Sequence, residues 1–225
     1  MIVGVPKESY PGERRVAVVP GSIASLKDMG FTVHIEKGAG LEAGFTDAMY
    51  EEQGAVLTDR EDILGKSDVI LQIRAVGTNP DTDESDLKAL KNDAIVIGLI
   101  DALSNKKAVE SLASKKVKSF ALELVPRITR AQSMDVLSSQ ANIAGYKAAL
   151  VAAENLPRMF PMMMTAAGTI TPAKVFVVGA GVAGLQAIAT CNRLGAVVSA
   201  YVVRSAVKEQ VKSLRAKFIE FEIDS

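Results

Sequence analysis

Short runs of β-branched and apolar residues alternate with helical patterns over residues 1–125. Strands of four to six apolar residues, each followed by a helix, are typical of a parallel sheet that is covered on both faces. The expected strands are residues 2–5, 32–36, 69–73, 94–99 and 117–122. The expected helices are residues 20–29, 47–53, 85–91 and 106–114, and the polar segment 77–85 is expected to be a loop. The pattern predicts an N-terminal flavodoxin-like α/β domain.

The pattern changes near Gln132. Residues 138–154 are rich in alanine and contain no proline, which favours a helix of about five turns. We expect this helix to connect two domains as a rigid strut. The apolar run Met162, Met163 and Met164 follows it, and we expect these side chains to pack in a core or between domains. A second α/β unit begins at Lys174.

A glycine-rich turn links the first strand and helix of this second unit. Residues 174–178 form a buried-strand pattern, the sequence GAGVAG follows at 179–184, and a helical stretch covers 185–194 before a second strand at 196–203. The GxGxxG pattern is weak evidence alone, but between a strand and a helix it is typical of a dinucleotide-binding turn. We predict an incomplete Rossmann domain that binds a dinucleotide.

Each glycine of the turn has a different expected role. Gly179 permits the tight turn, Gly181 lets the backbone approach a pyrophosphate, and Gly184 allows the helix to pack closely on the strand. Ala180 and Val182 complete the turn. The pyrophosphate then lies at the helix N-terminus, where unpaired N–H groups and the helix dipole favour an anion.

Composition and charge exclude several other classes of function. Lys and Arg total 26, as do Asp and Glu, and this zero net charge argues against a nucleic-acid partner. One Cys and one His exclude a zinc site built from these residues, and only His34 is available for a Ser-His-Asp triad. The sequence has no run of about 18 apolar residues, so we predict no membrane span. A single Cys fits a reducing compartment, so we expect a cytoplasmic protein.

The second strand of the Rossmann unit lacks an expected acidic residue. A carboxylate at its tip usually binds the ribose hydroxyls, whereas this tip reads Tyr201, Val202, Val203 and Arg204. Arg204 is either a partner for a 2′-phosphate or an ordinary surface arginine.

Four segments together resemble the alanine dehydrogenase and nicotinamide nucleotide transhydrogenase family. They are GVPKE…GERRVAVVP near the N-terminus, RITRAQSMDVLSSQANIAG at 127–145, PMMMTAAGT at 161–169 and GAGVAGLQAIATCNRLGA at 179–196. The sequence RAQSMDVLSSQ is similar to the NAD(H)-binding domain I of the transhydrogenase branch. This resemblance implies hydride exchange with NADP(H) on a partner domain, a membrane domain that carries protons, a homodimer, and a location peripheral to the inner membrane through partner subunits.

The resemblance also implies roles for individual residues. The residues that match the loop around the nicotinamide are Arg127, Gln132, Asp135 and Ser138, those that match the pyrophosphate turn are Gly179, Gly181 and Val182, and those at the family's Asp-Val-Arg positions are Val202, Val203 and Arg204. Gln132, Ser138 and the backbone supply the donor and the acceptor that a carboxamide needs. Either Arg127 and Asp135 pair with each other, or Asp135 caps the following helix.

The domains expected on this basis are residues 1–137, a connecting helix and Met-rich linker at 138–165, and the first half of an NAD-binding domain at 166–225. The last 25 residues depart from the family pattern. Ser205 replaces a Pro, and Arg215 replaces a helix-ending Gly, which forces a left-handed conformation on a non-glycine residue.

Two other functions remain open. Arg15 matches the arginine that grips the substrate carboxylate in alanine dehydrogenases, which suggests an alanine-type amino-acid dehydrogenase. That activity is disfavoured because the strand end that bears the family's lysine reads Gln72, Ile73 and Arg74, and no His follows His34. The third possibility is a truncated, non-catalytic nucleotide-binding remnant.

Overall fold

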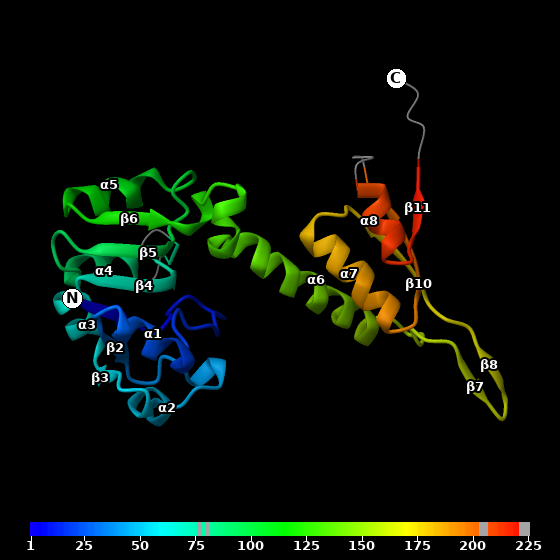
Figure 1. The fold of residues 1–225 in the computed structure, drawn as a ribbon, viewed down its shortest axis with the longest axis horizontal. Helices are drawn as coiled ribbons and strands as arrows, with labels where there is room; N and C mark the ends of the chain where they lie inside the picture. The colour runs from blue at the N-terminus through cyan, green and yellow to red at the C-terminus, as the bar shows by residue number, and fades with distance from the viewer. Residues whose placement is uncertain (76–77, 80–81, 203–206, 221–225) are drawn as a thin grey trace, which may run out of the picture. The chain divides into compact units, whose positions relative to one another are not determined.

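The computed structural model describes residues 1–75, 78–79, 82–202 and 207–220. They form two compact units, Met1–Asp135 and Val136–Ser225, and each has its own hydrophobic core (Figure 1). Within the described ranges, no helix is both long enough and apolar enough to cross a bilayer.

The first unit is built on a six-stranded parallel sheet, as the alternating pattern predicts. Its strands are β1 (Ile2–Val5), β2 (Thr32–Glu36), β3 (Val56–Thr58), β4 (Val69–Arg74), β5 (Ile95–Leu99) and β6 (Lys118–Ala121). Their order across the sheet is β3-β2-β1-β4-β5-β6. The five strands expected from the sequence have the 2-1-3-4-5 order of flavodoxin-like folds, and β3 adds a sixth strand at one edge. The α/β fold class is therefore confirmed.

Helices cover both faces of this sheet. They are α1 (Ile23–Asp28), α2 (Asp47–Glu52), α3 (Arg60–Lys66), α4 (Asp83–Ala89) and α5 (Lys106–Ser114), with 3-10 turns η1 (Pro20–Ser22), η2 (Leu41–Ala43), η3 (Leu122–Leu124) and η4 (Thr129–Met134). Successive strand residues contribute to opposite cores, because Ile70 belongs to one cluster and Leu71 packs against the other. The predicted loop at 77–85 is wrong at its end, where α4 already begins at Asp83.

The second unit contains the predicted half of a Rossmann fold. Its elements are α6 (Val136–Asn155), β7 (Met163–Thr165), β8 (Gly168–Ile170), β9 (Lys174–Val178), α7 (Val182–Arg193), β10 (Val197–Tyr201), α8 (Lys208–Ser213) and β11 (Lys217–Ile219). Strands β9, β10 and β11 form a parallel sheet in the order β11-β10-β9. The core of this unit comes from the inner faces of these strands and from α7 and α8.

The long helix α6 packs along α7 within the second unit (Figure 1). Contact between the two backbones is close at Gly145, where a Cβ atom would overlap the carbonyl oxygen of Ala183. Ala149, one turn further along α6, is also buried. The helix expected as a connecting strut is thus part of the packing of the second unit.

Of the two environments expected for the methionine run, packing in a core is wrong within the described chain, and packing between domains stays a prediction. Met163 and Met164 belong to the antiparallel hairpin β7–β8, and Met162 and Met164 are 60% and 81% exposed. The hairpin has no buried residue of its own, so these side chains form no core. Arg215 has φ +61°, which confirms the predicted left-handed residue after α8.

Candidate nucleotide-binding site

The glycine turn leads from β9 into α7. The backbone N–H of Gly179 donates to the carbonyl oxygen of Tyr201 at the end of β10, at 2.8 Å. Helix α7 starts at Val182, inside the motif and three residues earlier than predicted, and Gly181 is its N-cap with φ −75° and ψ −169°. The N–H of Leu185 donates to the carbonyl oxygen of Gly181 at 2.9 Å, which closes the first helical turn.

The fold requires glycine at two positions of the motif, and for different reasons. Gly179 has φ +93°, a backbone conformation that residues other than glycine rarely adopt. A Cβ atom at Gly184 would overlap the carbonyl oxygen of Gly179. At Gly181 neither reason applies, because its backbone is extended and, apart from its chain neighbours, no atom of the described residues lies within 4 Å of where a Cβ would be. The space beside Gly181 is therefore open at the start of α7.

The N-terminus of α7 can bind an anion. Its N-cap, Gly181, has no side chain to accept a hydrogen bond, and the first turn of α7 has no acidic residue. Unpaired N–H groups and the positive end of the helix dipole favour a phosphate group at this position. Val182 is 44% exposed, whereas Ala180 is buried and fixes the turn against the core.

At the tip of β10 the structure describes only part of the predicted ribose site. Val202 is half-buried and packs against the core of the second unit. It offers no acceptor to a ribose hydroxyl. Val203, Arg204 and Ser205 lie outside the described residues.

The predicted nicotinamide residues lie on both sides of the division between the units. Gln132 is within η4 and is exposed, as is Arg127 just before that turn. Asp135 follows η4, and its N–H donates to the carbonyl oxygen of Gln132 at 3.2 Å. Ser138 lies in the first turn of α6, in the second unit. Arg127, Gln132 and Asp135 thus share one short segment at the end of the first unit.

Arg15 is held by an internal carboxylate. Its Nε and Nη2 atoms donate to the two carboxylate oxygens of Glu13, both at 2.7 Å. These hydrogen bonds lower the pKa of Glu13, whereas burial raises the pKa of the neighbouring Glu8. Arg74, at the end of β4, lies over the ring of Tyr10 at 4.2 Å. The strand end that the resemblance matches to the lysine of alanine dehydrogenases, Gln72 to Arg74, therefore carries a guanidinium and no lysine.

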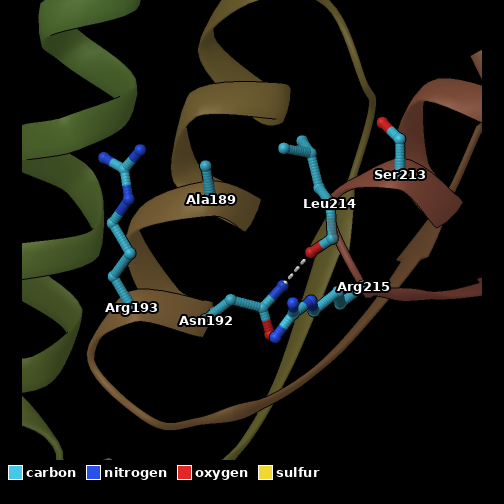
Figure 2. A pocket seen from close by; sticks show the side chains of 6 residues that line it. All are labelled: Ala189, Asn192, Arg193, Ser213, Leu214 and Arg215. Carbon is cyan, nitrogen blue, oxygen red and sulfur yellow. Dashed lines mark hydrogen bonds between the residues drawn. The ribbon is translucent and has the colours of Figure 1, made fainter.

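A pocket of about 360 Å³ lies at the opposite end of α7 from the glycine turn. Figure 2 shows its lining residues, which come from the ends of α7 and α8: Ala189, Asn192, Arg193, Ser213, Leu214 and Arg215. Asn192 Nδ2 donates to the carbonyl oxygen of Leu214 at 2.5 Å and joins the two helix ends. The pocket is separate from the predicted binding residues.

Comparison with known proteins places the chain in a family. Residues 4–144 match the profile described as "Alanine dehydrogenase/PNT, N-terminal domain", and residues 148–225 match that of the C-terminal domain. The chain belongs to the alanine dehydrogenase/PNT family. It is 49% identical over 221 residues to an NAD(P) transhydrogenase alpha-subunit protein of Rhodospirillum rubrum, covering 97% of this chain and 57% of that protein.

Two further relatives allow the chain to be compared with both branches of the family. The solved structure of transhydrogenase from Sinorhizobium meliloti is 51% identical with a TM-score of 0.93, covering 99% of this chain and 62% of the other. An alanine dehydrogenase of Staphylococcus epidermidis is 30% identical over 217 residues, covering 95% of this chain and 56% of the other. The chain therefore spans somewhat more than half of these relatives and is more similar to the transhydrogenases.

Sequence reasoning missed two residues that shape these segments. Gly145 permits the close contact between α6 and α7, and its signal was a lone glycine inside an otherwise alanine-rich helix. Glu123 binds the backbone after β5, and nothing in its local sequence indicates this, because its partners lie 21 and 23 residues away.

Proposed function

We propose that this chain is the NAD(H)-binding part of a proton-translocating NAD(P) transhydrogenase. The turn around Gly181 binds the pyrophosphate, and Arg127, Gln132, Asp135 and Ser138 bind and orient the nicotinamide end. NADP(H) binds on a partner domain, and a membrane domain carries the protons. The observation that carries the proposal is the open space beside Gly181, where neither the fold nor the backbone requires a glycine.

The protein residues in this proposal bind and orient, and the nicotinamide ring supplies the hydride chemistry when it is bound. The N–H groups at the start of α7 meet the pyrophosphate charge, and neither the N-cap Gly181 nor the first turn of α7 supplies a competing carboxylate. The amide of Gln132 supplies both a donor and an acceptor to the carboxamide, which fixes the ring's orientation. Exclusion of water between two facing rings then completes what hydride transfer needs, with no acid or base from this chain.

Hydride exchange between NADH and an NADP analogue, measured with an added NADP-binding partner, tests this function. We expect exchange that depends on both proteins. NADH binding without exchange would instead support a non-catalytic nucleotide-binding protein.

The second candidate is an alanine-type dehydrogenase, which Arg15 favours. The guanidinium of Arg74 and the hydrogen bonds from Arg15 to Glu13 argue against it. Alanine-dependent reduction of NAD is the direct assay, and we expect none.

A further inference from the structure

Glu123 connects the end of one strand to the loop after its neighbour. It lies in η3, directly after β6, and β6 pairs with β5 in parallel. Its carboxylate oxygens accept hydrogen bonds from the backbone N–H groups of Ala102, at 3.0 Å, and Ile100, at 3.3 Å. The half-buried side chain thus fastens η3 to the backbone that follows β5.

The backbone after β5 is shaped to receive this carboxylate. Asp101, between the two donors, has the left-handed φ of +56°. A left-handed residue within a turn directs neighbouring N–H groups to one side, and such concavities bind anions. The carbonyl oxygen of Asp101 also accepts from the N–H groups of Ser104, at 3.1 Å, and Asn105, at 2.9 Å, which fixes the turn from the other side.

The segment that leaves Glu123 carries the proposed nicotinamide residues. Only three residues separate Glu123 from Arg127. The backbone hydrogen bonds that follow are local, since Val125 donates to Leu122 and Asp135 donates to Gln132. The two bonds of Glu123, by contrast, span 21 and 23 residues and tie the start of the segment to the sheet.

We infer that Glu123 is a positioning residue, which fixes where the segment with Arg127, Gln132 and Asp135 begins and thereby orients the nicotinamide end of a bound dinucleotide. This inference rests on the proposed function. Glu123 acts through its hydrogen bonds to the backbone after β5. The pyrophosphate turn lies in the other unit, so the adenosine half of the cofactor does not depend on this contact.

The test compares NADH with ADP-ribose, which keeps the adenosine and the pyrophosphate but lacks nicotinamide. In Glu123→Gln one carboxylate oxygen becomes an NH₂ group that faces a backbone donor, so one of the two bonds is lost. We expect NADH affinity to fall by about tenfold and ADP-ribose affinity to stay unchanged. Hydride exchange with the partner should slow further, since a misplacement of about 1 Å can cost roughly 10²-fold. Glu123→Asp, which keeps the charge on a shorter side chain, should restore part of both losses.

Asp68→Asn is the matched control. Asp68 also accepts a backbone hydrogen bond, from Ile2 at 2.9 Å, and pairs with Lys91 at 2.6 Å, but it precedes β4, whereas Glu123 follows β6 at the other end of the parallel strands. This variant should change both affinities equally or not at all. Equal losses of NADH and ADP-ribose binding in Glu123→Gln, or no loss of either, would overturn the positioning role.

Failure of the inference and failure of the proposed function give different results. If Gln132→Asn slows hydride exchange while Glu123→Gln does not, only the positioning role is wrong. If Gln132→Asn and Gly181→Val both leave NADH binding and exchange unchanged, the proposed function is wrong.

Discussion

The resemblance to the family matches Val202 to an aspartate, and the isopropyl group of Val202 can accept no hydrogen bond from a ribose. Charge-assisted hydrogen bonds of that kind contribute about 1.5–3 kcal/mol. We therefore expect Val202→Asp to raise NADH affinity by roughly 10–100-fold. The new carboxylate also repels a 2′-phosphate, so the preference for NAD over NADP should increase. Calorimetric titration of both cofactors measures these changes.

Val202→Asn is the control for charge. Its amide oxygen accepts a hydrogen bond without repelling a phosphate, so affinity should rise less and cofactor preference should not change. Because Val202 packs against the core, both variants should lose some stability. If Val202→Asp leaves both affinities unchanged, the ribose is bound elsewhere.

Glu13 gives the first unit a specific dependence on pH. Its pKa lies below the ordinary value of 4.5 because Arg15 donates hydrogen bonds to the carboxylate. Its ionised form therefore contributes stability above about pH 4.5, and that contribution is lost as the pH falls through the lowered pKa. We expect the stability difference between the wild type and Glu13→Gln, measured by urea unfolding, to shrink steadily below that pH.

Glu8, in the same segment, has the opposite effect on how stability depends on pH. Burial raises its pKa above 4.5, so its ionisation disfavours the folded state as the pH rises from about 4.5 through the raised value. Glu8→Gln should remove that decline. If the two variants shift the pH profile in the same direction, the assignment of the two carboxylates is wrong.

Among the elements, a substitution at Gly145 in helix α6 has two opposing effects on stability. Alanine is favoured over glycine inside a helix by about 1 kcal/mol. Against α7, however, the added methyl group overlaps the carbonyl oxygen of Ala183, and overpacking of this kind costs about 1–3 kcal/mol. We expect Gly145→Ala to lower the free energy of unfolding and to weaken NADH binding, because α7 must move at its N-terminal end.

The exposed residue Ala148, on the same helix, supplies the comparison. Ala148→Gly should cost only the helix preference of about 1 kcal/mol and leave NADH binding unchanged. Increased stability in Gly145→Ala would show that the contact between the helices is looser than the geometry requires.

How much of the fold was predictable differs from element to element. Strand β2 and helix α5 were predicted residue for residue, because their patterns alternate or repeat over five or more positions. Strand β3 was missed because it has only three residues and lies at a sheet edge. Helix α3 was also missed, although the sequence contains an N-cap residue at its start. Asp59 is that N-cap, and its side chain accepts a hydrogen bond from the N–H of Asp62.

The hairpin β7–β8, the glycine turn and Glu123 show which structural features local sequence does and does not reveal. The three methionines are apolar without alternation, and the sequence alone does not reveal that the strand is exposed. The glycine turn was predictable because the constraints that require Gly179 and Gly184 lie within the six residues of the motif. The contact made by Glu123 was not, because it depends on which strands become neighbours in the sheet.

In the molecule as a whole, the glycine turn that we propose to bind the pyrophosphate belongs to the second unit. Each unit has a separate core, so a substitution at the glycine turn should act on the second unit and leave the first unit folded. Gly21, in η1 of the first unit, offers a matched position, since a Cβ there also meets no atom within 4 Å. Gly21→Val therefore reproduces the change in side chain without touching the turn.

Calorimetric titration of NADH into the wild type, Gly181→Val and Gly21→Val is the sharpest test of the proposed binding site. We expect Gly181→Val to abolish NADH binding while its unfolding transition in the absence of NADH stays close to that of the wild type, because the fold leaves this position open. Gly21→Val should bind NADH as the wild type does. Unchanged NADH affinity in a folded Gly181→Val variant would contradict the proposed site.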